Sequence, residues 1–391
     1  MSTAMIADLL PFPDELLSSW SERRAKGRPA IDRSSDAPRP SRRSWHQHNP
    51  DYCPSAAWLA WASAAFNVET GQLAGNALRR RYKAMRKEFV AWLYPPTGIG
   101  QATSPAVPCV RVAWCNRCLA EDHANARPAY FRQCWALAPQ TFCHKHRWPL
   151  EERCTICGAY NWTVVRTATN CVRLVCGECW RALERSMRAA LNASPSMLDA
   201  WDRVIALEAQ ILAALSGRTP DQFRFNFTSG AQLLNEVDDI AGILCRNYWG
   251  YTRTNIPLNA FSCPALAPGY LPKDFYESDG LHPLATGSIR KRRSLLAAIC
   301  AILDPDPTTG RTLYGPESRP SIEEFVSTTE RSAIEIPIST ADRWSPSFIG
   351  RLNGARRALE QKRKVSKLAG DLAAALLNNL NRSAANSGDR S

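Results

Sequence analysis

Apolar residues recur at helical spacing in several separate stretches of the chain. Residues 14–26 predict a short helix, with Asp14 placed to accept an amide hydrogen bond in its first turn. From Ser55 to Leu93 the pattern predicts a helix, a tight turn at Asn67-Val68, a second helix capped by Thr70 and a third helical stretch. This order is the outline of a helix-turn-helix.

Four more helices are predicted in the second half of the chain, at about 194–215, 228–248, 287–303 and 346–380. The last of these is strongly basic in its first half. Residues 109–180, in contrast, show no sustained helical period and carry cysteines, aromatic residues and turns. The sequence therefore predicts a mainly α protein that is interrupted by a cysteine-rich module.

The amino-acid composition indicates a globular protein with a strong positive net charge. Of 391 residues, 45% are hydrophobic, and 49 Lys and Arg face 36 Asp and Glu, which gives a net charge of +13. This charge favours a polyanionic partner. No apolar run approaches the roughly 18–20 residues of a membrane span, and the N-terminus lacks the basic start of a secretory signal. We expect a cytoplasmic protein, in which fourteen cysteines serve as metal ligands rather than disulfides.

The central module contains four ligand pairs with two residues between the members of each pair. Zinc takes four thiolate or imidazole ligands in a tetrahedron, and each pair can fill half of one site. Pairing in chain order predicts a first site of three cysteines and a histidine and a second site of four cysteines. An interleaved cross-brace is the competing topology, and Cys171 could replace Cys176. The predicted ligands are Cys115, Cys118, Cys143 and His146, then Cys154, Cys157, Cys176 and Cys179.

Both ligand sets are closed, so the sequence predicts two structural Zn²⁺ ions per chain and no catalytic zinc. The expected architecture has four parts, with a basic loop at 27–50 in the first. They are an N-terminal helix-turn-helix-like region at 1–95, a double zinc-ribbon-like module at 109–182, a helical C-terminal domain at 190–381 and a disordered tail at 382–391.

Basic residues cluster in and just after the predicted second helix of the helix-turn-helix. They fit phosphate contacts that provide sequence-independent affinity for DNA, and they fit a solvated helix face equally well. The first half of the last helix is open to the same two interpretations. The residues of the cluster are Arg79, Arg80, Arg81, Lys83, Arg86 and Lys87.

The order of these motifs resembles the TniQ/TnsD family of bacterial transposon target-selection proteins. The resemblance covers roughly residues 9–180, and Leu16 and the basic segment 27–50 depart from the family pattern. It rests on three stretches: Pro11-x-Pro13-Asp14-Glu15-Leu16-Leu17-Ser18-Ser19-Trp20; Cys115-x-x-Cys118-Leu119-x-Glu121-Asp122 followed by Tyr130-Phe131-Arg132-x-x-Trp135-x-Leu137; and Cys143-x-x-His146, Leu150 and Cys154-x-x-Cys157-Gly158.

The resemblance implies a non-enzymatic adaptor for DNA transposition, acting in the bacterial cytoplasm at the nucleoid. Family members bind target DNA, or a guide-RNA complex on DNA, and recruit an AAA+ ATPase of the TniB/TnsC kind that engages the transposase. The N-terminal apolar residues are the predicted ATPase contact, although they could instead pack onto the helix-turn-helix, and for Trp20 the core is favoured. These residues are Leu9, Leu10, Phe12, Leu16, Leu17 and Trp20.

Two other functions are weighed against the adaptor. A free-standing transcriptional regulator would use the same zinc module and helix-turn-helix. A nucleic-acid enzyme would need a general base or a carboxylate cluster, and only Asp304-x-Asp306 comes near; a phosphate-binding G-x-x-x-x-G-K-[ST] loop is also absent from the sequence. The mode of target recognition and the oligomeric state, a homodimer included, stay open.

Overall fold

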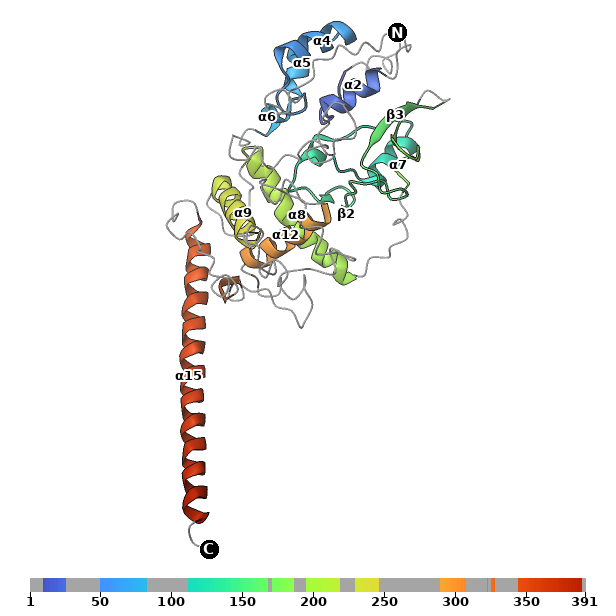
Figure 1. The fold of residues 1–391 in the computed structure, drawn as a ribbon. Helices are drawn as coiled ribbons and strands as arrows, with labels where there is room; N and C mark the ends of the chain where they lie inside the picture. The colour runs from blue at the N-terminus through green and yellow to red at the C-terminus, as the bar shows by residue number, and fades with distance from the viewer. Residues whose placement is uncertain are drawn as a thin grey trace.

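In the computed structural model, the described residues form mainly helices, and the strands lie in a small central module (Figure 1). It describes residues 10–25, 50–82, 112–167, 171–185, 195–218, 229–245, 289–304, 306, 322, 325–327 and 344–388. The predicted mainly α fold is confirmed. Residues 27–49 of the predicted basic loop at 27–50 and the third helical stretch near 85–93 lie outside the described residues.

The first predicted helix begins later than the sequence suggested. Helix α2 spans Leu17–Ala25, so the prediction that Asp14 caps it is wrong. The cap comes instead from Asp51, which is 33 residues away and accepts hydrogen bonds from the Ser18 amide at 2.8 Å and the Ser18 hydroxyl at 2.7 Å. Burial raises the pKa of Asp51 to about 6. Asp14 accepts a hydrogen bond from the Tyr130 hydroxyl at 2.9 Å.

The helix-turn-helix region begins as predicted and then departs from the expected pattern. Helix α4 (Ala56–Phe66) is capped by Ser55 and ends at Asn67, whose φ of 54° turns the chain. Helix α5 (Thr70–Gly75) is shorter than expected, and Thr70 is its first residue rather than its cap. Leu78 does not continue α5, because its amide donates to the Asp51 carbonyl at 2.8 Å. It starts the one-turn helix α6 (Leu78–Arg81).

The central module consists of one helix, a short 3₁₀ turn and two antiparallel hairpins. The pairing of Trp162 with Cys176 sets the register of the second hairpin. The sequence pattern missed the helix, which has only nine residues and begins directly after a predicted metal ligand. The elements are α7 (Asn116–Ala124), the turn Gln133–Ala136, β1 (Phe142–Cys143) with β2 (Trp148–Pro149), and β3 (Trp162–Arg166) with β4 (Val172–Cys176).

Three of the C-terminal helices match the sequence prediction to within a few residues and pack against one another. They are α8 (Pro195–Leu215), α9 (Gly230–Cys245) and α12 (Ile289–Leu303). Gly230 lets α9 approach α8 closely, because a Cβ there would lie 3.0 Å from the Cβ of Ala214. On its other side α8 contacts the central module, where Trp201 packs against Phe142 and Trp148 at ring distances of 5.7 and 5.6 Å.

A buried polar seam joins α8 and α12 to the central module. Glu208 of α8 is fully buried and accepts hydrogen bonds from the Thr141 amide at 2.9 Å, the Thr141 hydroxyl at 2.5 Å and the Phe142 amide at 3.2 Å. Arg293 of α12 donates to the Thr141 and Leu150 carbonyls. The buried core is therefore continuous across the expected boundary between 182 and 190.

Helix α15 (Pro346–Gly388) is fixed at its root and projects from the rest of the structure (Figure 1). The Ser345 amide donates to buried Glu236 of α9, and Arg351 donates to the last carbonyls of α12. The helix runs through Gly388, into the tail for which disorder was predicted from residue 382. Within the described residues, none of the helices has the length and apolarity that would let it cross a membrane.

The seam predicts a large stability loss from one side chain. Replacing Glu208 with Ala removes the acceptor of two buried amides and a hydroxyl, and unsatisfied buried donors are costly. We expect Glu208→Ala to lower the free energy of unfolding by about 3 kcal/mol, measured by denaturant titration.

Asp199→Ala is the matched control, because this carboxylate is exposed on the same helix. Equal stability of the two variants would show that the seam does not hold α8 to the central module.

Candidate metal centres

The eight predicted ligands come together in two closed clusters. Within each cluster the ligand atoms all lie within 4.8 Å of one another. The pairing follows chain order, so the interleaved cross-brace is not the arrangement of this chain. Each cluster is tetrahedral, one with three cysteines and a histidine and one with four cysteines, and the two together could hold two metal ions.

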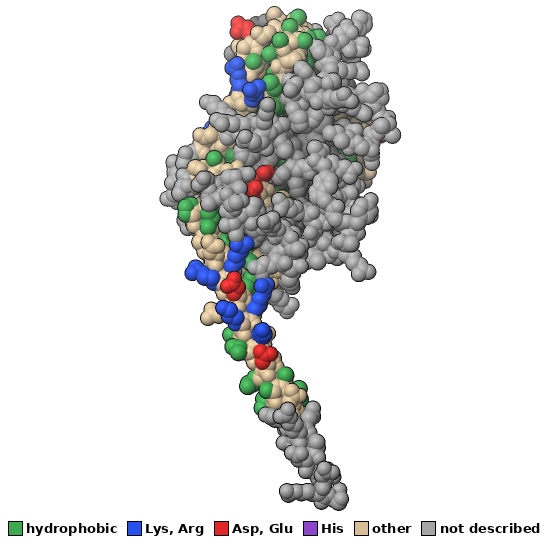
Figure 2. All heavy atoms as spheres, turned by 60° about the vertical axis from the view of Figure 1, so that its left-hand side comes forward, with side chains coloured by type: hydrophobic (Ala, Val, Ile, Leu, Met, Phe, Trp, Pro, Cys, Tyr) green, Lys and Arg blue, Asp and Glu red, His purple; other side chains and the backbone are tan. Residues whose placement is uncertain are grey.

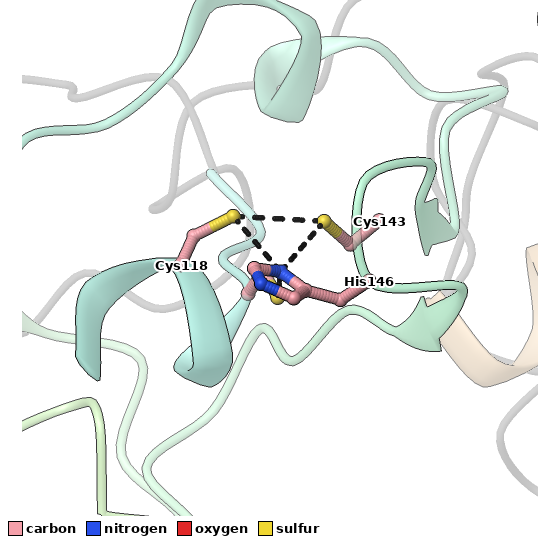
Figure 3. A group of neighbouring side chains, drawn as sticks. Cys118, Cys143 and His146 are labelled. Atoms are coloured by element: carbon pink, nitrogen blue, oxygen red, sulfur yellow. Dashed lines mark hydrogen bonds between the residues drawn. The ribbon is translucent and has the colours of Figure 1, made fainter. Parts of the chain in front are cut away.

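The first cluster joins the start of α7 to the β1–β2 hairpin (Figure 3). Cys115 precedes α7 and Cys118 lies in its first turn, whereas Cys143 ends β1 and His146 lies in the turn before β2. The Sγ atoms of Cys118 and Cys143 are 3.6 Å apart. His146 Nδ1 lies 3.3 to 3.5 Å from the three sulfurs.

These separations fit the edges of a metal-centred tetrahedron. Metal–sulfur bonds of about 2.3 Å and a metal–nitrogen bond of about 2.0 Å would place two sulfurs about 3.8 Å apart and a sulfur and a nitrogen about 3.5 Å apart. The observed separations are only slightly smaller. The donor atoms therefore lie where an ion at the centre would need them.

The second cluster lies at the open end of the β3–β4 hairpin. Cys176 ends β4, and the turn after it brings Cys179 to 3.6 Å from Cys154, measured between the Sγ atoms. Cys157 Sγ lies 3.5 Å from Cys176 Sγ. Cys171 is not a ligand, because its thiol points to the Arg127 carbonyl at 3.8 Å.

A cation would offset the charge of the thiolates in the first cluster. The neighbouring thiols of Cys115 and Cys143, together with burial, raise the pKa of Cys118 far above the ordinary thiol value. Several thiolates packed together repel one another, and burial removes the water that would otherwise stabilise their charge. A bound metal ion would supply the missing positive charge and release the protons.

Glu121 is a functional residue to which the sequence analysis assigned no role. Its Oε1 lies 2.8 Å from His146 Nε2, so the imidazole donates to the carboxylate while Nδ1 faces the sulfurs. The partner on Nε2 fixes both the tautomer and the ring orientation of the ligand. Lys145 also contacts Glu121, and the hydrogen bonds from Lys145 and His146 lower the pKa of Glu121 to about 2. The i, i+3 spacing of Glu121 from Cys118 on α7 was the available signal.

Aromatic side chains fill the space between the two clusters. Phe131 is fully buried and contacts Trp162 of β3 at 4.5 Å between ring centroids, Trp114 at 6.3 Å and Trp135 at 6.5 Å. Trp114 precedes the ligand Cys115, and Trp162 belongs to the hairpin of the second cluster. Phe131 thus links the two clusters through one apolar contact set.

The predicted ATPase contact is largely buried. Leu16 is 1% exposed, and Leu17 and Trp20 are fully buried. Trp20 packs on Phe66 of α4 at 5.0 Å. These three residues are therefore not available to a partner, and this part of the prediction is corrected.

Two further residues of that predicted contact are placed as well. Phe12 is half-buried and stacks on Tyr130 at 4.7 Å. Leu10 is 38% exposed, and Leu9 lies outside the described residues. Of the apolar residues that the sequence offered to a partner, Phe12, Leu16, Leu17 and Trp20 pack within the chain instead.

Three of the six predicted nucleic-acid residues lie in the described part of the chain, and one of these three has a structural contact. Arg79 and Arg80 are exposed on α6. Arg81 is also exposed, but its guanidinium donates to the Pro13 carbonyl at 3.2 Å and to Gln133 Oε1 at 3.3 Å, which gives it a structural role. The remaining three, Lys83, Arg86 and Lys87, lie outside the described residues.

Comparison of the sequence with protein-family models and with curated proteins finds no match.

The contact between Glu121 and His146 predicts a selective loss of metal affinity. Partners of a ligating histidine typically contribute 10- to 100-fold in affinity. Glu121→Gln should therefore weaken binding at the first cluster by roughly 10- to 100-fold, measured as Co²⁺ or Zn²⁺ competition with a chromophoric chelator.

Glu178→Gln is the matched control, because Glu178 lies beside the second cluster but its carboxylate binds Asn161. Equal affinities of both variants and the unaltered protein would contradict the role assigned to Glu121.

Proposed function

We propose that this chain is a zinc-dependent, non-enzymatic adaptor for DNA transposition that resembles the TniQ/TnsD family. It binds target DNA, or a guide-RNA complex on DNA, in the bacterial cytoplasm and recruits an AAA+ ATPase that engages the transposase. The proposal rests on the resemblance, on the two closed ligand clusters and on the positive charge of the chain.

One observation carries the proposal: the separate segments on which the resemblance rests meet in the fold. The Leu16 amide donates to the Phe131 carbonyl at 3.0 Å, and the Gln133 amide donates to the Asp14 carbonyl at 2.6 Å. The hydroxyl of Ser19 accepts from the Phe131 amide at 3.0 Å. Residues 11–20 and 130–137 thus form one unit, which supports reading them as parts of a single signature.

Zn²⁺ is the ion that the donor sets favour. Three thiolates with an imidazole, or four thiolates, in a tetrahedron are the ligands of structural zinc sites. Both sets are closed, and neither leaves a coordination position for a substrate. The role we assign to the metal is therefore to hold the hairpins and α7 together.

Exposed basic residues support a nucleic-acid partner. Arg79 and Arg80 lie on α6 next to the expected helix-turn-helix. Figure 2 shows a second group of Lys and Arg side chains on the first exposed part of α15. This group comprises Arg357, Lys362, Arg363, Lys364 and Lys367. Such side chains fit contacts to phosphates rather than to bases.

The first test concerns DNA binding. Each phosphate contact that is lost should reduce the slope of log K against log salt by about 0.9 for duplex DNA. Arg79→Gln combined with Arg80→Gln should therefore reduce it by about 1.8, measured by anisotropy of a labelled duplex at several salt concentrations. Arg127→Gln, an exposed arginine outside this group, is the control. An unchanged slope in the double variant would make these residues a solvated face only.

The second test concerns the partner. The full chain, bound to DNA, should retain an AAA+ ATPase of the TniB/TnsC kind in a pull-down. Removing residues 1–20 is unsuitable, because Leu16 and Trp20 belong to the core. Full-length protein that binds DNA but never retains the ATPase would end the adaptor proposal and favour a transcriptional regulator.

A further inference from the structure

Trp180 is held in a conformation that is unfavourable for its type. It follows the ligand Cys179 and has a φ of 58°, in the left-handed region. Side chains with a Cβ disfavour this region, and for a bulky residue it is an outlier. The indole is nevertheless 66% exposed, so burial of the ring does not compensate for the strained backbone.

The same position in other ligand turns shows how the chain meets this constraint elsewhere. Gly158 follows Cys157 with a φ of 78°, and glycine adopts it without strain. Arg147 follows His146 with a φ of 49° and binds Asp202 of α8. Trp180 has neither explanation, because its side chain makes no hydrogen bond, ion pair or ring contact in the part of the chain that the structure describes.

Exposed apolar and basic residues lie at the second cluster, beside whose ligand Cys179 Trp180 stands. The 3.6 Å contact between Cys154 and Cys179 brings the two ligand turns of the cluster together. Ile156, which lies between the cysteines of the other turn, is 47% exposed. The Thr155 hydroxyl donates to the Arg185 carbonyl at 3.2 Å, which brings Arg185 to the same end of the cluster.

Charge favours a polyanion at this end of the second cluster. The exposed cations are Arg153, whose guanidinium lies 4.3 Å over the Tyr160 ring, Arg181 and Arg185. The exposed carboxylate is Glu178, which accepts a hydrogen bond from Asn161 at 2.9 Å. An exposed aromatic ring with exposed guanidinium groups at the same end of a metal cluster is a combination that binds single-stranded nucleic acid, because every base has a face that can stack and every linkage carries a phosphate.

We propose that Trp180 is a stacking platform for an unpaired base of a nucleic-acid strand, with Arg153, Arg181 and Arg185 on its phosphates. The inference deepens the proposed function and rests on it, since it assigns to the second cluster the unpaired part of the bound nucleic acid. It explains why a tryptophan stands where the turn geometry calls for glycine.

Two substitutions at Trp180 separate the ring from the backbone. Trp180→Gly removes the ring and suits the left-handed backbone, so this variant should keep both metal ions and unfold at a slightly higher temperature than the unaltered protein. Its affinity for a labelled oligothymidine strand should fall about 5- to 150-fold. Affinity for a fully paired duplex should change far less. Trp180→Phe keeps a stacking face and should bind the strand within a few-fold of the unaltered protein.

A substitution at an arginine tests the phosphate contacts. Arg181→Gln should reduce the salt slope of strand binding by about 0.7, and Arg127→Gln should leave it unchanged. An unaltered slope in Arg181→Gln would remove this arginine from the proposed site.

The outcomes distinguish this inference from the proposed function. If Trp180→Gly binds the strand as the unaltered protein does, the inference is wrong, while duplex binding and ATPase recruitment leave the adaptor proposal standing. If Trp180→Gly loses ATPase recruitment but no nucleic-acid affinity, the site contacts protein and the inference is also wrong. If the unaltered protein binds neither strand nor duplex, both proposals fail together.

Discussion

The convergence of eight ligand side chains into two closed clusters is the constraint on which the described structure depends. The segment that carries them has one short helix and two hairpins, of which β1–β2 pairs only two residues in each strand. Such elements are too small to be stable alone. Their thiols also oppose one another when they are ionised in a buried site. A metal ion in each cluster would resolve both problems, because it would link the elements and neutralise the charge.

The rest of the fold is arranged around this module. Phe131 connects the two clusters, and the N-terminal segment pairs with the residues on either side of Phe131. Glu208 fixes α8 to the strand that carries the ligand Cys143, and Arg293 of α12 binds the same stretch. The position of the C-terminal helices, and through Arg351 that of α15, therefore follows from the geometry of the first cluster.

Structural features with a local sequence pattern were predictable from the sequence, whereas contacts between distant residues were not. The ligand pairs have a fixed spacing, and helices such as α8 have a sustained apolar period, so both were found. Asp51 caps α2 from 33 residues away, and no local pattern indicates that. Leu16 and Trp20 show the same limit, because their apolar character is equally consistent with a partner surface and with the core that they occupy. The exposure of Trp180 depends on a backbone angle that composition does not encode.

The central claim is that the metal clusters hold the helical region in place. It is tested most directly by amide hydrogen exchange before and after both ions are removed with a chelator. The account predicts that exchange accelerates in β1–β2 and in α8. Exchange in α4 should change little, because its buried residues belong to a separate small core with α2 and α5. Unchanged protection of α8 in the metal-free protein would contradict the account.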